Sequence, residues 1–278
     1  MRWFFCLTLV AGACGERDAP ACDLTGAAAG ALCPRTVRGR VVDEGGAPLA
    51  ARTVSVCADQ CYFGTTDDDG AFAVVPAQAI VLLQYALEVH GRPDRATYYT
   101  PLPTATGDAT HPTLAFPAPL PLPDLPATGP ALRDDGSAQV VASGDLELSI
   151  ASGTTLLLSV EDFGAPHGRE LRVRHLEAPA SLPFVDTSAP PLQLYAAAPF
   201  ELAFSQPVAV SLVNRSGLPA GAAVELQSLG GLVNGPPPAG RWRHAAAAHV
   251  SADGGRITTD LGEGIDELTW LAVREVKG

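Results

Sequence analysis

The chain has little positive charge, a single lysine and no long apolar run after its first residues. Its 278 residues contain 18 Lys plus Arg against 30 Asp plus Glu, which gives a formal net charge of −12 and a pI near 4.8. Binding to phosphate backbones requires a cationic face, so this composition speaks against nucleic acid as a partner. The one lysine is Lys277, and the preference for arginine favours a GC-rich bacterial genome.

The motifs of the commonest enzyme classes are also missing. The sequence has no G-x-S-x-G elbow, Walker loop, H-E-x-x-H motif or dinucleotide fingerprint. A hydrophobic fraction of 47% with 17% charged residues excludes a disordered chain, and 28 Gly with 25 Pro favour many turns and short elements over a helical bundle. We therefore expect an all-β protein that is not an enzyme and needs no cofactor.

The N-terminus has the layout of a secretory signal. Met1 and Arg2 give a positive start, and residues 3–13 form an apolar run too short to span a bilayer. Residues 9–14, LVAGAC, resemble a bacterial lipobox. The resemblance implies a signal peptide at 1–13 and a lipid on Cys14 that anchors the protein to the membrane as an outer-membrane lipoprotein of the cell envelope. Residues 11–13 also fit an ordinary signal-peptidase site, which would give a secreted protein.

Four of the six cysteines form an even set. Cys6 would leave with the signal and Cys14 would carry the lipid, which leaves Cys22, Cys33, Cys57 and Cys61 in an oxidising compartment. We favour two disulfides, Cys22 with Cys33 in a tether at 14–35 and Cys57 with Cys61 across a short turn. A zinc site made by the four is the alternative, although their spacing is not a recognised ligand pattern.

Short alternating strands with turn residues between them fill residues 36 to about 103. We expect strands at 37–42, 52–57, 61–66, 70–75 and 85–90, a spacing that indicates a β-sandwich. VRGRVVDEGGAPLAARTVSV (37–56) and GTTDDDGAFAV (64–74) resemble the carboxypeptidase regulatory-like family. The resemblance implies a prealbumin-like sandwich at 36–110 and a non-catalytic accessory role beside an enzyme.

Residues 111–133 are rich in proline. The run FPAPLPLPDLP (116–126) favours an extended polyproline conformation and is not expected inside a sheet. We expect this segment to be an interdomain linker. A PxxP ligand for a polyproline-binding partner is the alternative, but such partners are mostly intracellular.

Alternation resumes in a second domain at 134–278. GDLELSIASGT (144–154) and YAAAPFELAFSQPVAV (195–210) resemble ZU5-like β-rich modules. The resemblance implies protein–protein contact or extracellular display and not chemistry. Together the two halves predict two tandem β-sandwich domains, Ig-like or prealbumin-like.

The sequence offers one metal candidate that resembles a known site. Zinc carboxypeptidases use an H-x-x-E pair with a distant His, and His167 with Glu170 fits that pair, with His244 or His249 as the third ligand. Strand periodicity after residue 130 does not fit the α/β domain of such enzymes, so an exposed loop is the other interpretation. His244 and His249 are expected on opposite faces of a strand.

Two further features have a functional and a structural interpretation. The Asp run at 67–69 could hold calcium, but too few ligands follow and a tight turn with Gly70 is favoured. Trp242 and Trp270 could stack on sugars, although large aromatic residues usually bury. We expect a non-enzymatic binding or structural module of the cell envelope, with a partner protein or glycan. The alternatives are an accessory or degenerate zinc-peptidase-related protein and a carbohydrate-binding surface protein.

Overall fold

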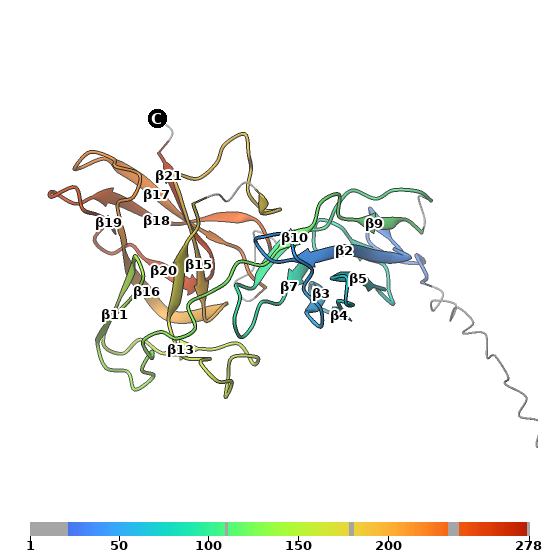
Figure 1. The fold of residues 1–278 in the computed structure, drawn as a ribbon, viewed down its shortest axis with the longest axis horizontal. Coiled ribbons are helices and arrows are strands. Elements are labelled where there is room, and N and C mark those ends of the chain that lie inside the picture. Colours follow the sequence, from blue (N-terminus) through green and yellow to red (C-terminus); the bar gives the residue numbers. More distant parts are fainter. Residues whose placement is uncertain (1–21, 109–110, 178–180, 233–238, 277–278) are drawn as a thin grey trace, which may run out of the picture.

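The computed structural model describes residues 22–108, 111–177, 181–232 and 239–276, and these residues fold entirely into strands, turns and loops. The all-β prediction is confirmed. Two halves lie side by side, with the early strands in one and the strands after residue 139 in the other (Figure 1). The signal expected at 1–13 and the lipidation site Cys14 lie outside the described residues. No helix long and apolar enough to cross a membrane occurs in the described part of the chain.

The first half is a β-sandwich of two four-stranded sheets. Its strands include the five expected from alternation, to within two residues at each end. One sheet has the order β4 (Cys61–Thr65), β3 (Thr53–Cys57), β7 (Ala86–Val89) and β8 (Tyr98–Pro101). In the other, β2 (Thr36–Val42) pairs with β5 (Ala71–Val74), β9 (Thr113–Ala115) and β10 (Leu120–Pro121). A separate pair joins β1 (Ala31–Leu32) to β6 (Ile80–Val81). Alternate apolar side chains of the two sheets meet in one core, as the period of two requires.

The proline-rich segment differs from the linker expected at 111–133, because part of it belongs to this sandwich. β9 and β10 both pair in parallel with β2, and Leu120 and Leu122 are fully buried. Prolines alternate with these leucines, so the leucines still offer backbone N–H groups on the edge that faces β2. The N–H of Leu122 donates to the carbonyl of Val42 at 2.8 Å. A proline is tolerated where its missing N–H faces away from the neighbouring strand, which is the position of an edge.

The second half is one sheet of eleven strands. Its main path runs β11, β12, β16, β19, β18, β17, β21, β15 and β14, while β13 and β20 both pair with β16. The strands are β11 (Gln139–Ser143), β12 (Leu146–Ile150), β13 (Leu156–Leu157), β14 (Arg172–His175), β15 (Gln193–Ala198), β16 (Leu202–Val213), β17 (Ala223–Leu229), β18 (Trp242–Val250), β19 (Arg256–Thr259), β20 (Ile265–Leu268) and β21 (Leu271–Glu275). The sheet curls around its own core until its ends meet, and there the N–H of Val173 donates to the Ser143 hydroxyl at 3.2 Å.

The two halves share a hydrophobic core, which the expectation of separate domains on a linker did not include. Every residue of β15 is buried, because Leu194 and Ala196 face the first half while Tyr195 and Ala197 face the core of the second. The shared core also contains Trp270, which follows β20 and is fully buried. A strand that is covered on both faces reads as a continuous apolar run, as β15 does from Leu194 to Ala198.

Candidate functional site

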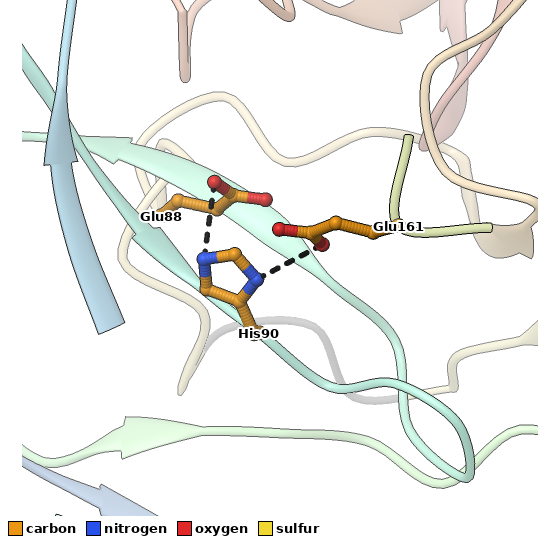
Figure 2. Close-up of side chains that lie close together, drawn as sticks. All are labelled: Glu88, His90 and Glu161. Carbon is orange, nitrogen blue, oxygen red and sulfur yellow. Dashed lines mark hydrogen bonds and ion pairs between the residues drawn. The ribbon is translucent and has the colours of Figure 1, made fainter. Parts of the chain in front are cut away.

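Buried polar residues gather where the two halves meet. In β7 the apolar Leu87 and Val89 point into the first sandwich, so Glu88 and His90 point together toward the second half. Both side chains are more than nine-tenths buried. Glu161 reaches them from the loop between β13 and β14 (Figure 2). Buried charges of this kind require partners, and each has them.

His90 lies between two carboxylates. Its Nε2 is 3.2 Å from Glu88 Oε2, and its Nδ1 is 3.2 Å from Glu161 Oε2. The hydroxyl of Ser55 donates to Glu88 Oε2 at 3.1 Å and lies 3.2 Å from Nε2 of the ring. Burial disfavours the charged imidazole, but the hydrogen bonds to Glu161 and Glu88 outweigh it and raise the pKa of His90 to about 9. The ring is therefore an imidazolium at neutral pH.

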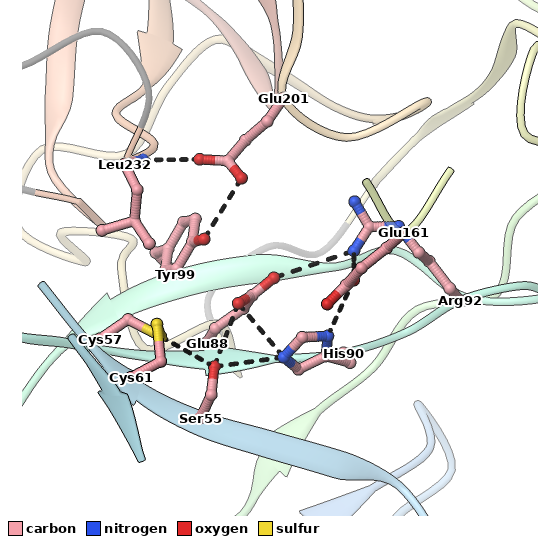
Figure 3. Close-up of a disulfide and its surroundings, with 10 residues drawn as sticks. All are labelled: Ser55, Cys57, Cys61, Glu88, His90, Arg92, Tyr99, Glu161, Glu201 and Leu232. Carbon is pink, nitrogen blue, oxygen red and sulfur yellow. Dashed lines mark hydrogen bonds and ion pairs between the residues drawn. A yellow bond between two sulfur atoms is a disulfide. The ribbon is translucent and has the colours of Figure 1, made fainter. Parts of the chain in front are cut away.

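Arg92 fastens the loop of Glu161 to the first half. Its Nε and Nη2 donate to the two carboxylate oxygens of Asp162 at 3.0 and 3.1 Å. Nη2 also donates to the Ser159 hydroxyl and to the Phe200 carbonyl. Nη1 forms an ion pair with Glu161 (Figure 3). The bidentate contact of Arg92 with Asp162 is strong and also fixes the relative orientation of the two side chains.

A second buried carboxyl continues the polar cluster. The hydroxyl of Tyr99 donates to Glu201 Oε2 at 3.3 Å and the N–H of Leu232 donates to Oε1 at 2.6 Å (Figure 3). Glu201 has a φ of 61°, a left-handed conformation that costs free energy in a non-glycine residue. Burial raises the pKa of Glu201 to about 7, opposed by the Leu232 N–H and assisted by the negative charges of Glu88 and Glu267.

The four cysteines form two disulfides. Cys22 is bonded to Cys33 and Cys57 to Cys61, which is the connectivity favoured from the sequence. Because the sulfurs are bonded to one another, they are not zinc ligands, and that alternative is wrong. The Sγ of Cys57 lies 3.2 Å from the Ser55 hydroxyl oxygen, so this disulfide borders the buried cluster (Figure 3).

The structure does not bring the expected histidines together. His167 Nδ1 lies 2.9 Å from Glu170 Oε1 on an exposed loop. His244 and His249 are also exposed, and they pair instead with carboxylates of Glu225 and Asp260. Within the described ranges, the one group of three potential metal ligands is Glu88, His90 and Glu161. The zinc site proposed around His167 and Glu170 therefore finds no third ligand there.

The remaining candidates take structural positions. Asp67 Oδ1 accepts the N–H groups of Asp69 and Ala71 at 3.0 and 2.8 Å, which is the tight turn favoured over a calcium loop. Trp270 is fully buried, so a sugar cannot reach its ring. Trp242 is half-buried, and its Nε1 donates to the Phe184 carbonyl at 3.0 Å.

Glu88, His90, Glu161 and Glu201 were not predicted from the sequence. One signal was present: Glu88 and His90 stand two apart in the otherwise apolar strand expected at 85–90, so both must lie on one buried or half-buried face. Glu161 and Glu201 join them only through the packing of the two halves. Comparisons with models of protein families, with curated proteins and with solved structures found no match.

Proposed function

We propose that the protein is an exported, non-enzymatic binding or structural module of the cell envelope, held at the membrane by a lipid on Cys14. The observation that carries the proposal is how the charged side chains between the two halves are paired. The side chains best suited to chemistry pair with one another and hold the two halves together; they are Glu88, His90, Arg92 and Glu161. A rigid scaffold needs such contacts, whereas catalysis needs a group that faces a substrate.

Further contacts across the junction support a scaffold role. The indole N–H of Trp270 donates to the Thr97 carbonyl at 2.7 Å, and the guanidinium of Arg172 donates to the Pro93 carbonyl at 2.5 Å. Two disulfides are consistent with an oxidising, extracellular setting. The resemblances to carboxypeptidase regulatory-like and ZU5-like modules point the same way, since both imply an accessory or display role.

Crosslinking in the native envelope, followed by mass spectrometry, tests the proposal. The chain has one lysine, so an amine-reactive reagent would label little, and a carboxylate-reactive crosslinker should be used on the 30 Asp and Glu. We expect a reproducible partner protein and membrane retention that the Cys14→Ser variant loses. Retention that is unchanged in Cys14→Ser would contradict the anchor, and the lack of any partner would contradict the binding role.

A carbohydrate ligand is the second candidate, favoured by one surface feature. A hollow of about 480 Å³ is bordered by the half-buried ring of Trp242 and by Asp186, Arg241, Pro101 and Pro183. An aromatic ring beside charged hydrogen-bonding groups suits a sugar, which has apolar faces and hydroxyl edges. We expect an envelope polysaccharide to change tryptophan fluorescence, and Trp242→Ala to abolish the change. Polysaccharide binding that survives Trp242→Ala would exclude this hollow.

A further inference from the structure

The polar cluster where the two halves meet offers a set of metal ligands that no sequence motif predicts. One ring nitrogen of His90 and one carboxylate oxygen from each of Glu88 and Glu161 lie within 4.8 Å of one another (Figure 2). We propose that Glu88, His90 and Glu161 form a binding site for a divalent transition-metal ion such as Zn²⁺, which ties the two halves of the protein together. The inference does not depend on the proposed scaffold function.

The donor set suits such an ion. Imidazole nitrogen with carboxylate oxygens is a common environment for Zn²⁺, at bond lengths of about 2.0–2.2 Å. The 3.2 Å between Glu88 Oε2 and His90 Nε2 is close to the separation of two ligands on one tetrahedral ion. Glu161 now contacts the other ring nitrogen, so it must shift toward the ion, and its position on a loop allows that movement.

Neighbouring side chains hold the ligands as metal sites require. The Ser55 hydroxyl donates to Glu88, and Arg92 holds the loop that carries Glu161 through its two contacts with Asp162. Hydrogen bonds of this kind orient ligating carboxylates, and their loss typically weakens metal binding by about 10–100-fold.

The charges of the cluster leave room for a divalent cation. The carboxylates of Glu88, Glu161 and Asp162 all pair with the guanidinium of Arg92. Once the ion displaces the ring proton of His90, these five side chains sum to −2, which one divalent ion balances. The ion has a route inward, because the side chain of Glu161 is 42% exposed while those of Glu88 and His90 are 8% and 9% exposed.

Calorimetric titration of the full chain with Zn²⁺, after removal of metals with EDTA, tests this proposal. We expect one ion per chain at the strongest site. Glu161→Gln keeps the size of the side chain and should weaken that binding by more than about tenfold. Co²⁺ should give visible absorption bands with the unaltered protein and much weaker bands with the variant.

Glu170→Gln is the matched control, because Glu170 lies on the same loop as Glu161 but pairs with His167 and not with the ligands of the proposed site. It should leave the affinity unchanged. His90→Gln gives a second test at the junction, with circular dichroism to verify the fold. Lack of saturable binding, equal affinity in Glu161→Gln, or a loss caused by Glu170→Gln would overturn the proposal.

Discussion

Trp270 joins the two halves of the protein and offers the sharpest test of their shared core. It belongs to the second half and is fully buried, yet its ring packs at right angles against Tyr98 of the first half, with 6.0 Å between ring centroids. A second edge contact, at 4.9 Å, is made with Phe184. Its indole N–H donates to the Thr97 carbonyl at 2.7 Å. Truncation of this side chain therefore removes packing from both halves at once.

The expected cost follows from these contacts. Replacement of a buried Phe or Trp by Ala typically lowers the free energy of unfolding by about 3–5 kcal/mol, which includes the cavity that is left. Trp270→Phe keeps most of the packing but leaves the buried Thr97 carbonyl without the indole donor, at about 1–3 kcal/mol. We expect the order of stability to be unaltered protein, then Trp270→Phe, then Trp270→Ala.

Urea unfolding followed by both circular dichroism and fluorescence measures these differences. We expect one transition in each protein, with a lower midpoint and an unchanged slope in the variants. Trp242→Ala is the control, because Trp242 is only half-buried and should cost less. A Trp270→Ala loss below about 1 kcal/mol, or one no larger than that of Trp242→Ala, would refute the shared-core argument.

Three further predictions concern other parts of the molecule. Burial raises the pKa of Glu201 to about 7 in the folded protein, against 4.5 in the unfolded chain. The stability that the protonated carboxyl contributes is therefore complete below pH 4.5 and is lost as the pH rises through 7, by up to roughly 3 kcal/mol. Glu201→Gln should flatten that decline in urea unfolding measured at several pH values, and an unchanged decline would exclude Glu201 as its source. Replacing Cys57 and Cys61 together with Ala should lower the free energy of unfolding by about 2 kcal/mol, a small loss because the closed loop is short. If residues 120–122 belong to the sandwich, Leu122→Ala should cost about 2–5 kcal/mol in thermal or urea unfolding, whereas the exposed Leu157→Ala should cost less than about 0.5; similar losses would mean that the proline-rich segment is not part of the fold.

The strands with one buried face were predictable from the sequence. In β2 the buried Val37 and Val41 alternate with more exposed residues, and period two identifies such a strand without any tertiary information. The two disulfides were predictable as well, because the short loops at 22–33 and 57–61 favour local pairing.

Features that depend on contact between the halves were not predictable in the same way. Proline content argued for a linker, but it did not show that Leu120 and Leu122 would be covered by β2 and the sandwich core. Large aromatic residues such as Trp270 usually bury, yet only packing shows that Trp270 faces the first half. The candidate site brings together Glu88 and Glu161, which lie 73 positions apart, so no local pattern connects them. The spacing of Glu88 and His90 is the one local sign of the site.

Urea-dependent hydrogen exchange, measured by mass spectrometry on the unaltered protein, tests most directly whether the two halves are one cooperative body. The relevant amides are those of β7 and β8 in the first half and of β15 and β21 in the second, since these strands carry the shared core. We expect the same opening free energy and the same urea dependence for all four strands. A lower opening free energy with a smaller urea dependence in one half would show that this half unfolds alone, and that the two halves are not one cooperative body.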